Sequence, residues 1–257
     1  MSKSDAIRNY DREGKNYDNV RYGRTKGGRF FSELELSKTL GMLQAGKTLH
    51  IGTATGRVSL YLVERGHDYV GLEISGVMAR IAKEKLNGSG NIVRGDAEHL
   101  PFKQGIFDNV VCVRAFHFLP EPTRFLWDAF EVLKANGRLI TSFEKRVVGR
   151  AFFEKLRIVP SHRVPRKYYY NMEAARLCSR TGFEIRFKGN VTKLPLLVYW
   201  RLRKDYLLRR FHHALPYWFG TVGMIVGDKT GNASSQQTGT RSITRDTSAD
   251  ANREANS

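Results

Sequence analysis

Residues 50–56 read HIGTATG, a loop that joins the strand-like run TLHIG to the helix-like run GRVSLYLVERG. A loop at the carboxyl end of a strand that leads into a helix presents free backbone N–H groups to the polar groups of a ligand. Gly52 and Gly56 allow a close approach of the backbone, and Thr53 and Thr55 add hydroxyl groups. The stretch therefore predicts a ligand-binding turn between a strand and a helix.

Strands and helices then alternate along the chain. We expect a helix in residues 30–43, strands at 48–52, 68–75, 91–96, 107–116 and 138–145, and helices at 56–66, 76–86 and 122–137, the last closed by Gly137. A helix at 171–183 and strands at 183–190 and 221–229 follow, and these two strands can pair antiparallel at a sheet edge. The pattern predicts an α/β fold, a doubly wound Rossmann-like sheet that is mostly parallel with an antiparallel last strand.

The domain organisation follows from composition. We expect a flexible N-terminal arm or lid in residues 1–30, one domain over 31–229 with a basic aromatic insertion at about 190–218, and a disordered tail over 230–257. No apolar run reaches the length of a membrane span, so we expect a cytoplasmic protein. Cys112 and Cys178 lie in apolar contexts without metal-ligand spacing, which favours buried thiols and no metal site.

The positive charge is concentrated late in the chain. The formal net charge is +18, while residues 31–144 hold 13 basic and 13 acidic residues. Residues 145–229 hold 19 basic and 5 acidic residues. A neutral first half beside a basic second half suggests an anionic partner, or an anionic surface that presents one.

An acidic side chain ends the second predicted strand. Glu73 follows Gly52 by 21 residues, where a carboxylate can hold two ribose hydroxyls. Dinucleotide sites require G-x-G-x-x-G, whereas Ala54 and Arg57 stand at the second and third glycine positions. Asp96, at the end of the third strand, lies on the same rim, where it can accept from an adenine amine. The residues therefore favour adenosine without a pyrophosphate.

At this point the sequence resembles the class I S-adenosylmethionine-dependent methyltransferases, in their UbiE-like (methyltransferase type 11) branch. The resemblance runs from about residue 11 to residue 229. It rests on six segments in the family's order: LHIGTATGR, YVGLEIS, GDAEHLPF, FDNVVCVRAFHFLPEP, FEVLKANGRLI and RTGFEI. It implies an enzyme that uses S-adenosyl-L-methionine. The cofactor-binding residues that it implies are His50, Gly52, Thr53, Ala54, Thr55, Gly56, Glu73, Ile74, Asp96, Ala97 and Arg114.

Two residues depart from the family's pattern. The family usually has an acidic residue where His50 stands and a glycine where Ala54 stands. Alanine is tolerable there if its φ stays below zero. A neutral imidazole attracts the cofactor's ammonium group less than a carboxylate does, so we expect weakened rather than abolished binding. These departures keep open a second reading, a non-catalytic methyltransferase-like binding subunit.

Methyl transfer from a sulfonium is an in-line displacement in which the protein mainly supplies alignment. The segment from Arg114 to His117 is expected to flank the methyl group, and His117 is the candidate catalytic base, against the alternative of a packed structural histidine. Tyr10, Tyr17 and Tyr22, with Arg21 and Arg24, are expected either to form a lid or to be a solvated arm.

The acceptor is the least determined part. No N-P-P-Y or D-P-P-Y tetrad follows the fourth strand, and neither cysteine lies in a Pro-Cys loop, which disfavours methylation of bases in nucleic acid by those two mechanisms. Residues 194–218 interleave aromatic and basic side chains, which suits a membrane interface, the phosphates of RNA, or a helix that covers the sheet. We rank a small-molecule or lipid-like acceptor first, with possible peripheral contact to an anionic membrane, and RNA second. A soluble metabolite remains open.

Overall fold

The computed structural model describes residues 3–19, 26–146, 166–193, 210 and 220–230. The helical segments in these ranges are α1 (Lys3–Glu13), η1 (Gly14–Asn16), α2 (Lys26–Leu40), α3 (Arg57–Val63), α4 (Gly76–Leu86), η3 (Phe116–Phe118), α5 (Pro122–Val132) and α7 (Asn171–Arg180). The strands are β1 (Thr48–Ile51), β2 (Tyr69–Glu73), β3 (Asn91–Arg94), β4 (Phe107–Val113), β5 (Leu133–Glu144), β6 (Phe183–Asn190) and β7 (Val222–Lys229).

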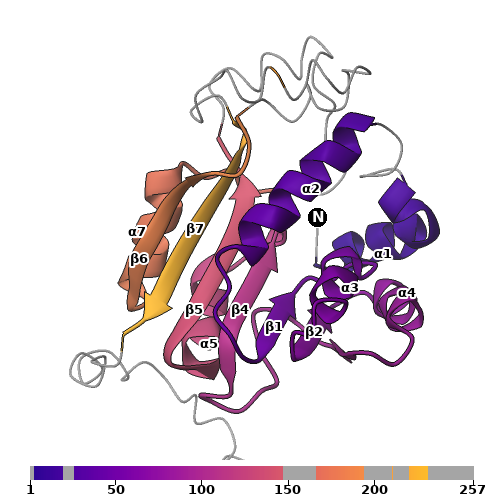
Figure 1. Cartoon of the computed structure of the whole chain (residues 1–257), viewed down its shortest axis with the longest axis horizontal. Coiled ribbons are helices and arrows are strands. Elements are labelled where there is room, and N and C mark those ends of the chain that lie inside the picture. Colours follow the sequence, from indigo (N-terminus) through magenta and orange to yellow (C-terminus); the bar gives the residue numbers. More distant parts are fainter. Residues whose placement is uncertain (1–2, 20–25, 147–165, 194–209, 211–219, 231–257) are drawn as a thin grey trace, which may run out of the picture.

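These seven strands form one sheet in the order β3-β2-β1-β4-β5-β7-β6 (Figure 1). The first five in chain order pair parallel, and β7 lies antiparallel between β5 and β6. The chain order reverses beside β1, so the loops after β1 and β4 diverge and leave a crevice at the carboxyl ends of these strands. The predicted fold class, a mostly parallel sheet with an antiparallel last strand, is confirmed.

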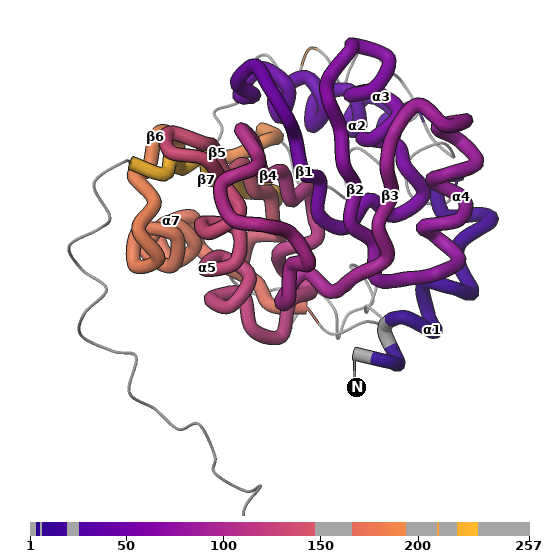
Figure 2. Tube along the Cα trace, turned by 90° about the horizontal axis from the view of Figure 1, so that it is seen from below, coloured from indigo at the N-terminus to yellow at the C-terminus, as the bar shows by residue number. Residues whose placement is uncertain are grey.

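Helices cover both faces of the sheet (Figure 2). Alternate residues of β4 serve the two faces: Val110 and Cys112 pack with α5 and α7, whereas Val111 and Val113 pack with α2, α3 and α4. This alternation is the period of two that a strand buried on both sides requires. Both cysteines are buried and unbridged, and burial raises the pKa of the Cys112 thiol to about 12.

Several predicted element boundaries differ from the structure, and two of the differences have a clear cause in the sheet. The strand predicted for residues 107–116 ends at Val113, because Arg114 has a φ of +55°, which turns the chain out of the sheet. The helix predicted to close at Gly137 ends at Val132, because Leu133 is extended and pairs with Phe107 of β4. In both places the packing of the sheet overrides the helix or strand preference of the local sequence.

Several sequence-based expectations fall outside the described residues. These expectations concern most of the aromatic and basic stretch at 194–218, the residues Arg21, Tyr22 and Arg24, and the tail beyond residue 230. Within the ranges that the structure describes, no helix has the length and apolar character needed to cross a membrane.

An ion-pair cluster fixes β7 between its neighbours. Asp228 accepts hydrogen bonds from Arg138 of β5 at 2.7 and 3.0 Å and from Arg186 of β6 at 2.9 Å. Burial alone would raise the pKa of the Asp228 carboxyl, but the two arginines outweigh it and hold the pKa below its ordinary value of 3.8. The pair interactions therefore stabilise the fold above this pH and are lost as the pH falls through the lowered pKa.

We expect Asp228→Asn to lower the free energy of unfolding by about 2–3 kcal/mol at pH 7, because it removes charge-assisted hydrogen bonds from two arginines. The difference from the unsubstituted protein should narrow in urea titrations as the pH falls below 3.8, because the carboxyl of the unfolded chain is protonated first and that of the native protein at lower pH. Asp68→Asn is the control, because Asp68 is 65% exposed and 3.8 Å from Lys47. Equal losses for Asp228→Asn at pH 7 and pH 3 would contradict the assignment.

Candidate functional site

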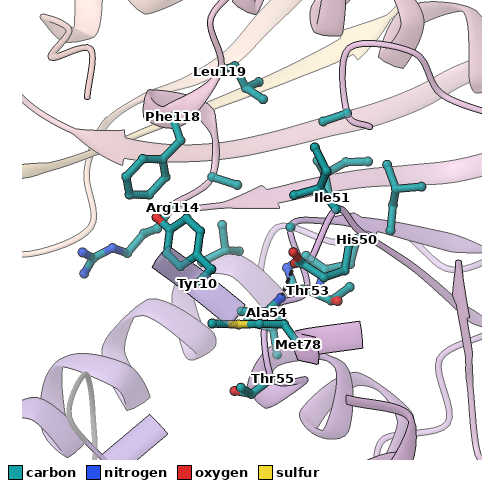
Figure 3. A pocket seen from close by; sticks show the side chains of 18 of the residues that line it. Tyr10, His50, Ile51, Thr53, Ala54, Thr55, Met78, Arg114, Phe118 and Leu119 are labelled. Atoms are coloured by element: carbon teal, nitrogen blue, oxygen red, sulfur yellow. Dashed lines mark hydrogen bonds between the residues drawn. The ribbon is translucent and has the colours of Figure 1, made fainter. Parts of the chain in front are cut away.

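A cavity of about 390 Å³ opens at the carboxyl ends of β1, β2 and β4 (Figure 3). Eleven of the twelve predicted site residues line it: His50, Gly52, Thr53, Ala54, Thr55, Glu73, Ile74, Asp96, Ala97, Arg114 and His117. These residues come from the ends of four different parallel strands and the loops that follow. The crevice created by the strand order therefore gathers residues that lie up to 67 positions apart in the chain.

Gly56 is the predicted residue that does not line the cavity. It precedes α3 with a φ of +82°, and a Cβ built there would lie 3.1 Å from both the Cα and the Cβ of Ala82 in α4. A side chain at this position would clash with α4 and would also strain the backbone. Gly56 therefore serves the packing of the loop against α4.

Ala54 does not meet the condition that we placed on it. Its φ is +47°, in the left-handed region, so an alanine here costs about 1 kcal/mol relative to an unstrained residue. The conformation points the Ala54 N–H at Glu73 Oε2, 2.7 Å away. The loop thus keeps the shape that a glycine would give it, at the expense of backbone strain.

Glu73 connects the two sides of the cavity. Its Oε2 accepts from Ala54 in the loop after β1, and its Oε1 accepts from the N–H of Ser75, 2.9 Å away, at the start of α4. Burial raises the pKa of the Glu73 carboxyl, and these backbone N–H groups oppose the rise. A carboxylate oxygen accepts two hydrogen bonds or more, so each oxygen keeps capacity for a ligand hydroxyl.

His50 is held as a neutral imidazole. It is 1% exposed, and burial, followed by the charge of Arg57, lowers its pKa to about 3. Its Nδ1 lies 3.5 Å from the hydroxyl of Tyr69, which in turn lies 2.5 Å from Ser59 Oγ. Its Nε2 has no hydrogen-bond partner among the described residues. The cavity wall therefore offers an unsatisfied buried nitrogen where the family usually has an acid.

The N-terminal segment lies against the mouth of the cavity. Ile7, Tyr10, Tyr17 and Asp18 line it, and the ring of Tyr10 meets Phe118 edge to face at 5.8 Å (Figure 3). Asp18 accepts a hydrogen bond from Thr55 Oγ1 at 2.5 Å, which ties this segment to the loop after β1. These contacts bring Tyr10 and Tyr17 to the cavity, and the role of this segment as a lid stays a prediction.

His117 lies on the wall beyond Arg114. It is 1% exposed, its ring centroid is 4.2 Å from that of Phe118, and its Nε2 is 3.9 Å from Oε1 of Glu144. This placement accommodates both of its expected roles, a base for the acceptor and a packed histidine, so its catalytic role stays a prediction.

Sequence reasoning missed part of the wall. The missed lining residues of interest are Met78, Phe118, Arg166 and Lys167. Met78 lies in the helix expected at 76–86, and Phe118 lies two residues beyond the strand expected at 107–116. Arg166 and Lys167 belong to the basic late part of the chain, whose charge was the available signal, but nothing in the sequence indicated that this stretch returns to the cavity.

Comparison with known proteins gives three findings. Residues 49–141 match the family model described as "Methyltransferase domain". An uncharacterised methyltransferase of Geobacillus kaustophilus is 30% identical over 54% of this chain and 69% of its own length. The ubiquinone/menaquinone biosynthesis C-methyltransferase UbiE of Wigglesworthia glossinidia brevipalpis is 34% identical over 35% of this chain, which spans about 37% of that relative.

The fold agrees with a solved structure as well. A methyltransferase of Thermotoga maritima, described as a possible histamine N-methyltransferase, superposes with a TM-score of 0.66 at 24% identity over 86% of this chain and 98% of that one. The fold, the cavity at the strand ends and the similarity to the Geobacillus methyltransferase all indicate the same family. The chain therefore belongs to the class I S-adenosylmethionine-dependent methyltransferases, in their UbiE-like branch.

Proposed function

We propose that this protein binds S-adenosyl-L-methionine in the cavity and transfers its methyl group to a small-molecule or lipid-like acceptor. The observation that carries the proposal is the joint placement of the Gly52 loop, Glu73 and Asp96 on one cavity wall. UbiE, by its name, acts in the biosynthesis of ubiquinone and menaquinone, which supports an acceptor of that lipid-like kind. The cavity volume of about 390 Å³ is in the usual range for small-molecule sites.

The residues present fit such a cofactor. Glu73 would hold the ribose hydroxyls through its remaining lone pairs, and Asp96 with the backbone of Ala97 would hold adenine. The loop from Gly52 to Thr55 would hold the methionine part. The orphaned Nε2 of His50 supplies an acceptor for an ammonium N–H, although without a charge. When bound, the sulfonium supplies an electrophilic methyl group with a neutral thioether as its leaving group.

Alignment and exclusion of water are the contributions of this chain to the transfer. Tyr10 and Phe118 cover the cavity between the loop after β1 and the turn after β4, which shields the reacting atoms from solvent. His117 would take a proton from the acceptor where the reaction releases one. An acceptor that is already a nucleophile does not need a base. The dependence of the methyl-transfer rate on pH therefore tests whether His117 acts as one.

The ribose assignment is tested by calorimetry with S-adenosylhomocysteine. We expect Glu73→Ala to weaken binding by about 1.5–3 kcal/mol, because hydrogen bonds to a charged group are lost. Glu73 also supports the loop, so Glu73→Gln, which keeps an acceptor oxygen, and thermal unfolding of both variants separate binding from folding. Glu84→Ala, an exposed acid on α4, is the control. No binding by the folded unsubstituted protein at millimolar ligand would refute the proposed function.

Backbone strain in the loop gives a second test. We expect Ala54→Gly to raise the free energy of unfolding by up to about 0.6 kcal/mol, because relief of about 1 kcal/mol of left-handed strain offsets or exceeds the added chain entropy of glycine, about 0.4–1 kcal/mol. Ala135→Gly is the matched control, since Ala135 is exposed and is not among the residues with positive φ. That control should lose stability in urea unfolding. A loss of similar size in both variants would show that Ala54 is unstrained.

Replacement of His50 tests the two readings of function against each other. His50→Asp should tighten binding of S-adenosylmethionine about tenfold, because a carboxylate pairs with the cofactor's ammonium group. His50→Asn introduces a side chain of about the same volume as aspartate but without its charge. Its affinity for S-adenosylmethionine should stay within threefold of that of the unsubstituted protein. If methyl transfer appears in His50→Asp alone, the natural chain is the binding subunit and not the enzyme. Equal affinities of the His50→Asp and His50→Asn variants for S-adenosylmethionine would exclude pairing with the ammonium group as the cause of any gain.

A further inference from the structure

Charge is segregated along the wall of the cavity. In the sheet order, Glu73 and Asp96 follow β2 and β3 on one side of β1, whereas Arg114 follows β4 on the other side. Arg166 and Lys167 line the same wall as Arg114 does, next to the end of β5. Arg57, after β1, also lines the cavity, but its guanidinium pairs with Glu35 at 3.0 Å. The end at Glu73 and Asp96 therefore carries the carboxylates, and the end at Arg114, Arg166 and Lys167, which remains for an acceptor, is basic.

Backbone hydrogen bonds of the residues that follow Arg166 hold it in place, and they connect this segment to η3 and to the end of β5. The N–H of Lys167 donates to the carbonyl of His117 at 2.8 Å, and the N–H of Tyr169 donates to the carbonyl of Glu144 at 3.4 Å. The N–H of Arg146 then donates to the carbonyl of Tyr169 at 3.0 Å. These bonds continue the edge of β5 and hold residues 166–169 against the cavity.

The guanidinium of Arg166 is buried and under-satisfied. Its side chain is 4% exposed, and its NH1 donates to Oε1 of Glu144 at 2.5 Å. Arg114 donates to the same oxygen at 3.1 Å, so one carboxylate oxygen serves two guanidinium groups. Among the described residues the Nε of Arg166 has no hydrogen-bond partner. A buried cation with unmet donors is costly unless a further anion approaches it.

The surroundings suit an anion attached to an apolar or aromatic body. Lys167 adds a second cation on the same wall, where its Nζ donates to the carbonyl of Pro120 at 2.5 Å. The guanidinium of Arg166 stacks over the ring of Phe118 at 4.9 Å, and Tyr10 covers that ring from the lid side. An acceptor can therefore pair its charge with the cations while its body contacts the two rings.

We propose that the methyl acceptor carries an anionic group, a carboxylate or a phosphate, that binds to Arg166 and Lys167 at the basic end of the cavity. This inference rests on the proposed function and specifies its substrate class. Glu144 positions the guanidinium of Arg166, and the ring of Phe118 packs against that guanidinium. The acceptor's reacting atom then lies on the side of the anion that faces the cofactor end.

The test titrates phenyl phosphate, benzoate and the neutral probe benzyl alcohol into the full chain, with and without saturating S-adenosylhomocysteine, by calorimetry. We expect one of the two anions to bind and benzyl alcohol to bind at least tenfold more weakly. Arg166→Met should weaken binding of the preferred anion at least tenfold, and Lys167→Met should weaken it about threefold. Arg124→Met is the control, because Arg124 is 53% exposed, pairs with Asp128 and does not line the cavity.

The identity of the preferred probe tells a phosphate-bearing acceptor from a carboxylate-bearing one. Equal binding of the neutral and anionic probes, or anion affinities unchanged in both cavity variants, would overturn the inference. So would a loss of S-adenosylhomocysteine binding in Arg166→Met, because the guanidinium would then hold the cofactor's own carboxylate. Lys167→Met keeps the test decisive if Arg166→Met does not fold. Failure of S-adenosylhomocysteine to bind the unsubstituted protein refutes the proposed function separately, since the anions are also titrated without it.

Discussion

The cavity depends on the carboxylate of Glu73, which joins the loop after β1 to the start of α4 through Ala54 and Ser75. Without it, the N–H groups of Ala54 and Ser75 would lose their acceptors, and the loop after β1 would lose its side-chain tie to the start of α4. The strain at Ala54 is tolerated because this bond over-determines the loop. A ligand that uses the same carboxylate therefore binds to a group whose position is already set, which lowers the entropy cost of binding.

The charges around that anchor divide the cavity into two environments. On the side of Glu73 and Asp96, His50 remains neutral because burial lowers its pKa to about 3, and under the proposed function the two carboxylates would accept from hydroxyl and amine groups of the cofactor. On the other side, Glu144 is shared by Arg114 and Arg166. Under the two proposals, the cofactor and an anionic acceptor could thus bind in one cavity, each in the environment that matches its charge. Two residues of the basic late part of the chain, Arg166 and Lys167, return to the strand ends and contribute to this division.

Local pattern predicted most of the fold because buried strands and amphipathic helices have distinct periods. The helix at 76–86 and the strand at 183–190 have the bounds that the sequence indicated, and the residues at the strand ends gather where parallel topology puts them. The bounds near Arg114 and Leu133 were wrong because backbone turns and sheet pairing decided them. The positive φ of Ala54 and the return of Arg166 to the cavity depend on contacts between distant segments, for which a single sequence carries no local signal.

The position of β7 has a consequence for how the chain folds. Its partner Arg138 precedes Asp228 by 90 residues, and among the described strands β6 pairs only with β7. Closing so long a loop costs entropy before any contact compensates for it, so the edge formed by β6 and β7 is expected to assemble after the parallel core. Until then the outer edge of β5 is exposed to other chains as an unpaired strand. The interval before β7 docks is therefore the period in which the protein is most prone to misassociate, and chaperones would protect it most effectively there.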